Sequence, residues 1–304
     1  MKIIISGASG LVGRALTAAL RSEGHTVLHL VRRSGHSTEP AREGEVLWDP
    51  HSATVDVAAL EAADAIAHLN GASIAGGRWT PARKQILRSS RIDTTRILVD
   101  SIARLRQKPR VFVAASAVGY YGHRGDEILT ESSSVGTGFL ALLARDWEAE
   151  AIRAQTGAGV RTTILRFGVI FAAEGGALGP MLAPFKFGLG GPLGTGDQWI
   201  SWVALQDVIA MIRLVIANPE FAGPLNVVSP HPVRNSEFAR TAGKILHRPA
   251  IFPTPAFLLR LAVGEMAGAL LLTSQRVIPE RLLSVNFPFQ FPDLESTLRA
   301  ILKK

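Results

Sequence analysis

KIIISGASGLVG, the stretch at residues 2–13, places a short apolar run directly before a cluster of glycines. Val12, Leu16 and Leu20 then recur at helical spacing, and Gly24 ends the pattern. A strand, a glycine turn and a helix in this order are typical of a dinucleotide site. The glycines let the backbone approach a pyrophosphate, and the helix N-terminus offers free N–H groups to it. The stretch therefore predicts a nucleotide cofactor at this turn, with a purely structural turn as the alternative.

The second predicted strand, residues 26–31, ends in Arg32 and Arg33. Sites that prefer NAD usually place a carboxylate here for the ribose hydroxyl, whereas an arginine suits the 2′-phosphate of NADP. No Asp or Glu occurs between Gly24 and Thr38. The sequence therefore predicts NADP(H) as the cofactor, with Arg32 as the main contact. Two arginines that merely face solvent are the alternative.

Length and composition indicate a full α/β domain with a smaller appended region, because the chain has 304 residues, of which 47% are hydrophobic. The absence of cysteine excludes disulfides, thiolate catalysis and cysteine-based zinc sites. His25 and His29 fall in a turn and a strand, so we expect no metal site. The formal net charge of +8 is scattered, without a basic tail, and we expect no nucleic-acid partner.

No apolar run reaches the length of about 18–20 residues that crosses a membrane. The nearest, residues 257–272, is interrupted by Arg260 and Glu265 and predicts one or two buried helices. We expect a cytoplasmic protein that binds a small-molecule substrate and no membrane, either as a monomer or as a homodimer. Residues 34–45, rich in Gly, Ser, Pro and charge, are expected to be mobile.

Apolar runs typical of buried strands continue to alternate with helical patterns along the chain. The further predicted strands are residues 64–71, 111–116, 162–167 and 225–228, and the further predicted helices include residues 57–63, 81–105 and 208–217. This alternation predicts an α/β fold, a doubly wound parallel sheet of the Rossmann type with helices on both faces.

Composition divides the chain into two predicted regions. Residues 1–167 form an NADP-binding Rossmann domain, to which residues 203–230 return. Residues 168–202, dense in Gly and Pro, and residues 231–304 form a smaller C-terminal region that binds substrate and caps the crevice. The apolar segment 257–302 is too short for its own core, so we expect it to pack against residues 168–202.

In a doubly wound sheet, the carboxyl ends of the strands line one ligand crevice. The turn after residues 64–68 and the hydroxyl of Ser116 should therefore face the same ligand as the first glycine turn. The predicted cofactor contacts are Gly7, Ser9, Gly10, Leu11, Val12, Gly13, Arg32, Arg33, Leu69, Asn70, Gly71, Arg91, Ala115 and Val169. For Arg91 the alternative is an arginine on a helix surface.

The spacing of Gly7, Gly10 and Gly13 resembles that of extended short-chain dehydrogenases/reductases. More narrowly, the chain is similar to their atypical epimerase-like family, often labelled NAD-dependent epimerase/dehydratase or nucleoside-diphosphate-sugar epimerase. The stretches that carry this resemblance are Arg78-Trp79, Ser90-Arg91, residues 116–122, Trp147-Glu148, Leu165-Arg166 and residues 188–192, 229–235 and 275–289. The resemblance implies a Rossmann fold, NADP(H) binding and a C-terminal substrate region, but it implies no particular substrate.

The sequence departs from that superfamily at the catalytic residues. Its members use a Tyr-x-x-x-Lys pair, which should lie on the helix after Ser116, but residues 139–148 contain neither Tyr nor Lys. Relatives also commonly carry a histidine after the position of Trp202, where this chain has Val203 and Ala204. The usual acid/base machinery of the superfamily is therefore absent.

The remaining candidates for catalysis are Ser116 and Tyr120. Ser116 is expected to donate a hydrogen bond to substrate, and Tyr120 or its neighbour Tyr121 to act as a proton donor. A capping serine and aromatic packing are the alternatives, and Arg166 fits either an anion clamp or a buried ion pair. The sequence thus predicts an NADP(H)-binding, epimerase-like oxidoreductase acting on a small polar or sugar-like substrate. The alternative is a non-catalytic NADP(H)-binding redox sensor or partner-binding protein.

Overall fold

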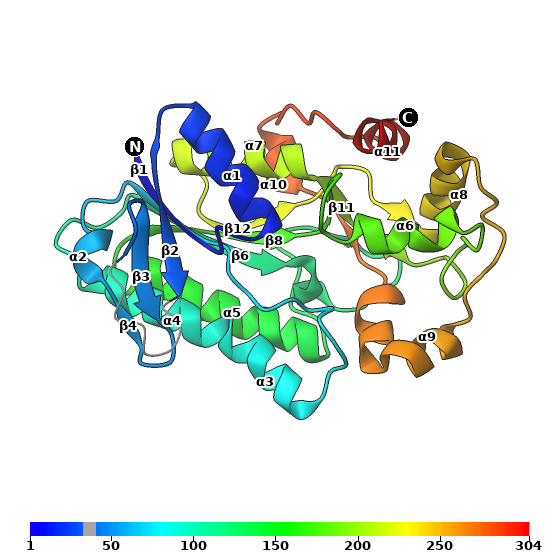
Figure 1. Ribbon diagram of the computed structural model, residues 1–304, viewed down its shortest axis with the longest axis horizontal. Helices are drawn as coiled ribbons and strands as arrows, with labels where there is room; N and C mark the ends of the chain where they lie inside the picture. Colours follow the sequence, from blue (N-terminus) through cyan, green and yellow to red (C-terminus); the bar gives the residue numbers. More distant parts are fainter. Residues whose placement is uncertain (33–40, 304) are drawn as a thin grey trace.

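The computed structural model describes residues 1–32 and 41–303 of the chain (Figure 1). Its central sheet has eight strands in the order β12-β8-β6-β5-β1-β2-β3-β4, of which β4 alone is antiparallel to its neighbour. These strands are β1 (Lys2–Ser6), β2 (Thr26–Arg32), β3 (Glu45–Asp49), β4 (Thr54–Val55), β5 (Ala65–His68), β6 (Val111–Ala117), β8 (Arg161–Phe167) and β12 (Gly223–Val227). The strand order reverses between β1 and β5, which is where doubly wound sheets bind their ligands. The predicted fold class is confirmed.

Helices cover both faces of the sheet (Figure 1), so the central strands β5 and β6 are buried almost throughout. Ile3 and Ile5 of β1 face one core together with α1 and α7, whereas Ile4 faces a second core with α2, α4 and α5. The helices around the sheet are α1 (Leu11–Ser22), α2 (Val57–Leu60), α3 (Pro81–Ser89), α4 (Ile92–Ala103), α5 (Phe139–Thr156) and α7 (Leu205–Ala217).

The prediction of one helix over residues 81–105 is wrong, because the chain breaks between α3 and α4. Arg91 has φ −116°, well away from the φ of about −63° of a regular helix. The turn after β5 forms hydrogen bonds to Ser90 at this break. Asn70 Nδ2 donates to the Ser90 carbonyl at 3.2 Å, and the Ala72 N–H donates to the Ser90 hydroxyl at 3.1 Å. These bonds fix the turn after β5 against the start of α4.

The C-terminal region has a third core, formed by α6, α8 and α11 with Phe171 and Trp202. Outside the central sheet and its helices, the chain forms β7 (Ile128–Leu129), β9 (Val169–Phe171), α6 (Leu178–Lys186), β10 (Trp199–Ile200), β11 (Trp202–Ala204), β13 (Val233–Arg234), α8 (Asn235–Leu246), α9 (Ala256–Val263), β14 (Arg276–Val277), α10 (Glu280–Ser284) and α11 (Leu294–Leu302). A 3₁₀ turn, η1 (Val118–Tyr121), and a π-helical turn, η2 (Ala267–Leu271), complete the described structure.

The predicted packing of residues 257–302 against residues 168–202 is confirmed. Gln198 Nε2 donates to the carbonyl of Leu271 at 3.0 Å, and the Ser201 hydroxyl donates to the carbonyl of Gln275 at 2.7 Å. Further along, the carboxylate of Asp207 accepts the N–H groups of Gln290 and Phe291 at 2.8 and 3.0 Å. β14 also pairs with β7, which lies far earlier in the sequence.

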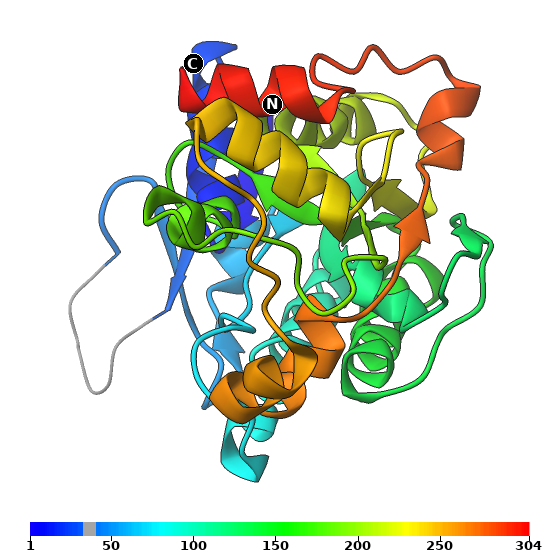
Figure 2. The same cartoon turned by 90° about the vertical axis from the view of Figure 1, so that its right-hand side faces the viewer.

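The prediction that residues 257–272 form buried helices is wrong for α9, which contains no buried residue. Phe257 and Leu261 are 66% and 71% exposed. Figure 2 shows why: α9, drawn in orange, lies at one end of the molecule, where no other element covers its outer face. No helix of the described residues is long and apolar enough to cross a membrane. Most of the segment expected to be mobile, residues 34–45, lies outside the described residues.

His68 should make the stability of the fold depend on pH. It ends β5 in full burial, with Nδ1 2.8 Å from the Ser6 hydroxyl and Nε2 3.1 Å from the Thr95 hydroxyl. Burial lowers the pKa of His68 to about 3. Between this value and the unfolded value of about 6.5, the unfolded chain binds the extra proton. The stabilisation is therefore complete above pH about 6.5 and falls by up to about 1.4 kcal/mol per unit as the pH drops toward 3.

Urea unfolding over pH 4.5 to 7 tests this expectation. His68→Gln removes the titrating group, so the free energy of unfolding of this variant should change less steeply with pH than that of the wild type. Equal slopes in the two proteins would show that the pKa of His68 is the same in the folded and the unfolded chain.

Candidate functional site

The glycines of the first turn lie where side chains do not fit. Gly7 has φ +69°, and a Cβ there would lie 2.8 Å from the carbonyl oxygen of Leu69. A Cβ on Gly13 would lie 2.3 Å from the carbonyl oxygen of Gly7, so helix α1 packs directly on the turn. Gly10 donates its N–H to the same oxygen at 2.9 Å and begins α1 as its N-cap. The turn is therefore a bare backbone cradle, as a bound pyrophosphate requires.

The N-terminus of α1 is open toward an anion. It has no side-chain cap and no acidic residue in its first turn. The first N–H groups of a helix, here at Leu11, Val12 and Gly13, have no partner within the helix. Arg14 adds a cation close by, donating to the carbonyl of Ser9 at 2.6 Å. The positive end of the helix dipole and these donors suit a phosphate.

The turn after β5 lies against this cradle, as predicted. The Ser6 hydroxyl donates to Asn70 Oδ1 at 2.9 Å, while Asn70 Nδ2 reaches the Thr94 hydroxyl at 3.1 Å. The backbone of Leu69 closes over Gly7. The structure thus brings Leu69, Asn70 and the following Gly71 beside the first turn at the switch point of the sheet.

Arg32 ends β2 as an exposed residue at the same edge of the sheet. It pairs in register with Trp48 of β3, so the end of β3 also lies on the cofactor side. Arg33 lies outside the described residues. The contribution of β3 was missed in the sequence, although the polar Asp49 after Trp48 at a strand end was a usable signal.

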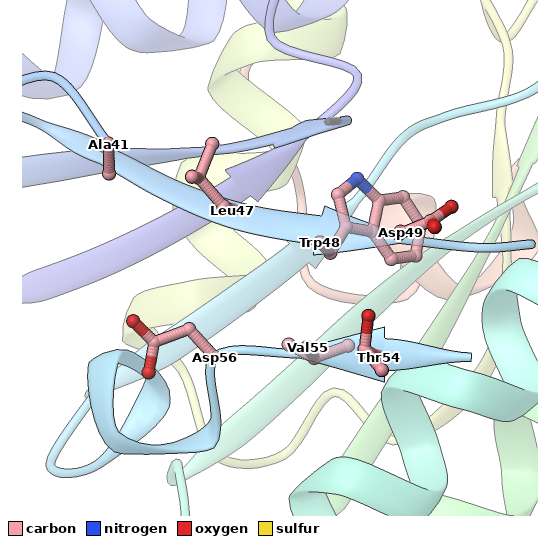
Figure 3. A pocket seen from close by; sticks show the side chains of 7 residues that line it. All are labelled: Ala41, Leu47, Trp48, Asp49, Thr54, Val55 and Asp56. Carbon is pink, nitrogen blue, oxygen red and sulfur yellow. The ribbon is translucent and has the colours of Figure 1, made fainter. Parts of the chain in front are cut away.

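A hollow of about 350 Å³ lies beside β3 and β4. Figure 3 shows the side chains that line it, which are Ala41, Leu47, Trp48, Asp49, Thr54, Val55 and Asp56. The indole N–H of Trp48 is buried and has no hydrogen-bond partner among the described residues. An unpaired buried donor is costly, so this side chain is a candidate ligand contact.

Arg91 points back into the protein. Its guanidinium donates to the carbonyls of Leu87 and Ala72 at 3.2 and 3.0 Å, and it would contact a Cβ placed on Gly71 at 3.0 Å. Burial, followed by the charge of Arg83, lowers its pKa to about 10. These bonds hold the turn after β5 in place, and the predicted contact between Arg91 and a cofactor phosphate stays a prediction.

Ser116 lies at the carboxyl end of β6, one residue after Ala115. Its hydroxyl proton already takes part in a hydrogen bond within the protein. Its hydroxyl donates to Glu148 Oε1 at 2.6 Å. A hydroxyl has one proton and two acceptor lone pairs, so Ser116 offers a ligand only an acceptor in this arrangement. This bond opposes the predicted role of Ser116 as a donor to substrate, and both that role and its place in the site stay predictions.

Arg166 forms a buried ion pair, the second of the two alternatives. Its Nε and Nη2 donate to the two carboxylate oxygens of Glu148 at 2.9 and 2.7 Å, and both residues are buried. Burial alone would lower the pKa of the Arg166 guanidinium, but its bonds to Glu148 and Tyr121 raise it above its ordinary value. An arginine held in this way is not free to clamp a substrate anion.

The two tyrosines have different surroundings. Tyr121 is fully buried, donates to Asn226 Oδ1 at 2.6 Å and accepts from Arg166 at 2.9 Å. Burial raises the pKa of Tyr121 to about 12, against the opposing effects of Arg166 and Asn226, so this phenol is a structural group. Tyr120 is half-buried, with its ring 3.6 Å from the Arg166 guanidinium. Tyr120 is therefore the tyrosine that remains as a candidate proton donor.

Apolar side chains occupy the positions where relatives in the superfamily carry the Tyr-x-x-x-Lys pair and the histidine. Phe139 begins α5 and packs edge-on against Trp79 at 5.3 Å, with Lys84 Nζ 5.0 Å from its ring centre. Val203 and Ala204 are fully buried on β11, which pairs with Val169 and the rest of β9. Helix α5 itself therefore carries no Tyr-x-x-x-Lys pair.

A second hollow, of about 370 Å³, lies in the C-terminal region. Gln198 lines it together with His123, Arg234 and Arg260, so polar and charged side chains meet there. Trp202 instead stacks on Phe171 with ring centres 5.4 Å apart, which is ordinary core packing.

Comparison with known proteins agrees with this geometry. The model of the NAD dependent epimerase/dehydratase family matches residues 3–228, and a domain family of unknown function, DUF1731, matches residues 254–301. The epimerase family protein Mb2239 of Mycobacterium bovis is 42% identical over 287 residues, which cover 94% of this chain and 93% of that protein.

Two solved structures are also similar. Human epimerase family protein SDR39U1, solved with NADPH, has a TM-score of 0.89 at 32% identity, with both chains fully covered. The nucleoside-diphosphate sugar epimerase of Corynebacterium glutamicum has a TM-score of 0.79 at 33% identity, covering 99% of this chain and 58% of that one. With the glycine cradle at the switch point of its sheet, the chain belongs to the NAD-dependent epimerase/dehydratase family.

Proposed function

We propose that this protein binds NADP(H), with the pyrophosphate on the first turn and the 2′-phosphate on Arg32. The observation that carries the proposal is the cradle formed by Gly7 and Gly13, which a single Cβ would fill. Arg32 at the end of β2 supplies a cation at the ribose side. The similarity to a human relative solved with NADPH supports the same cofactor.

Arg32→Ala should lower the affinity for NADPH and leave the affinity for NADH unchanged. A charge-assisted hydrogen bond to phosphate contributes about 1.5–3 kcal/mol, so the affinity for NADPH should fall by about tenfold or more. NADH lacks the 2′-phosphate, so its affinity should stay the same. Fluorescence titration measures both, and the exposed Arg104→Ala is the matched control. Equal affinity of the wild type for NADH and NADPH would contradict the assignment.

We further propose that the protein is an oxidoreductase for a small polar or sugar-like substrate, held by residues 168–202 and 231–304. When bound, NADP(H) would supply or accept the hydride. The chain itself would contribute the Ser116 oxygen, which accepts a hydrogen bond from a substrate hydroxyl, and the Tyr120 phenol as the nearby titratable group. Because Ser116 can only accept, we expect the site to favour substrates in the hydroxyl form.

Ser116→Ala tests this part of the proposal. Loss of one oriented hydrogen bond should lower turnover by about 10–1,000-fold and leave NADPH affinity unchanged. Nicotinamide absorbance measures turnover with panels of alcohols plus NADP⁺ and of carbonyl compounds plus NADPH. Unchanged turnover in the variant would remove Ser116 from the site.

A non-catalytic role is the second candidate, favoured by the apolar start of α5 and by the commitment of the Ser116 proton to Glu148. In that case the protein would bind NADP(H) as a redox sensor or partner-binding protein. Absence of turnover in both directions, in a preparation that binds NADPH tightly, would support this role.

A further inference from the structure

One end of the molecule exposes apolar side chains from three neighbouring segments. Figure 2 shows the end of α6, the segment that leads to α9, and α9 itself on the same side. We call this surface the α9 face. Its exposed apolar residues, each 49–80% accessible, are Phe187, Leu189, Ile251, Phe252, Phe257 and Leu261.

These segments are joined by backbone hydrogen bonds. The N–H of Phe252 donates to the carbonyl of Gly190 at 3.2 Å. Thr254 donates to the carbonyl of Pro192 and accepts from the N–H of Gly194, both at 2.9 Å. Thr254 leads directly into α9. The segments that carry the six side chains are therefore neighbours, and exposed apolar residues on neighbouring segments mark an interaction surface.

The segments that form the α9 face carry cations and no carboxylate, although Asp126 and Asp197 line the hollow beside Arg260. Neither residues 175–196 nor residues 238–264 contain an Asp or a Glu. Lys186, Arg248 and Arg260 are exposed there, and none of them forms an ion pair with a carboxylate of the described chain. Surfaces that lie in a membrane interface typically combine exposed Phe and Leu side chains with Lys and Arg around them.

We propose that the α9 face docks onto an anionic membrane surface. The apolar side chains would enter the boundary between headgroups and acyl chains, and the three cations would lie among the lipid phosphates. A second copy of this chain is a poorer occupant, because a two-fold contact would bring two basic rims together. The proposal concerns contact with the membrane surface and is independent of the cofactor.

Sedimentation with vesicles of phosphatidylcholine, with or without phosphatidylglycerol, tests the proposal. The wild type should bind only the vesicles that contain phosphatidylglycerol, and high salt should release it. Phe257→Asp with Leu261→Asp should weaken binding at least tenfold. Lys186→Ser with Arg248→Ser and Arg260→Ser should weaken it on the order of 100-fold.

Matched controls change the same residue types elsewhere. Ile86→Asp with Leu142→Asp alters exposed apolar residues on α3 and α5, and Arg104→Ser with Arg106→Ser and Arg110→Ser removes exposed cations. Both controls should bind vesicles like the wild type, and thermal melting should show every variant folded. Failure of the wild type to bind either vesicle would overturn the proposal. A dimer in analytical ultracentrifugation that the Phe257/Leu261 variant dissociates would assign the face to a second copy instead.

Discussion

Gly13→Ala should abolish NADPH binding within the measurable range, a loss of at least about 100-fold. The new Cβ would lie 2.3 Å from the Gly7 carbonyl oxygen and 2.7 Å from Ala8 Cα, both backbone atoms. No side-chain rotation relieves this contact, so α1 must move away from the turn and its N–H groups leave the phosphate position. Overpacking of this kind costs about 1–3 kcal/mol of stability, which the fold should survive. Fluorescence titration and urea unfolding measure the two effects separately.

Gly24→Ala is the matched control. Gly24 follows the other end of α1 with φ +79°, and a Cβ there would meet no atom within 4 Å. This variant should lose about 1 kcal/mol through backbone strain and keep its affinity for NADPH. If Gly13→Ala binds NADPH as the wild type does, the turn is only structural.

Glu148→Gln should destabilise the fold by about 3–5 kcal/mol. The change keeps the shape of the side chain but leaves the buried Arg166 guanidinium without its countercharge. The Ser116 hydroxyl also loses its charged acceptor. Urea unfolding followed by tryptophan fluorescence measures the loss.

Glu295→Gln provides the comparison at the surface. Glu295 pairs with Lys244 and Arg299 at a side-chain exposure of 37%, and pairs of this kind contribute about 0–1 kcal/mol. A loss at Glu148 no larger than that at Glu295 would mean that the Arg166 charge is solvated in the fold.

The first turn could be predicted from the sequence because its information is local. Gly7, Gly10 and Gly13 lie within one strand–turn–helix unit, and a side chain at Gly7 or Gly13 would collide with the backbone of that unit or of the adjoining turn. The position of Arg32 at the end of β2 could be predicted for the same reason. The strand itself determines which residue lies at its end, so this information is also local.

The remaining site could not be predicted, because its contacts join distant segments. The Ser116 proton goes to Glu148, on a later helix, and the break at Ser90 depends on Asn70 from an earlier turn. The exposure of α9 has another cause. Apolar periodicity shows which residues avoid water, but it does not show whether any element of the same chain covers them.

The pairing of β7 with β14 sets the order in which the chain can fold during its synthesis. Ile128 and Leu129 of β7 pair with Arg276 and Val277 of β14. The carboxylate of Asp207 accepts hydrogen bonds from the N–H groups of Gln290 and Phe291. The ribosome must therefore release residues up to Phe291 before all of these bonds form. Contacts of such long sequence separation form slowly. We therefore expect the central sheet of the nascent protein to form before residues 276–291 dock onto it.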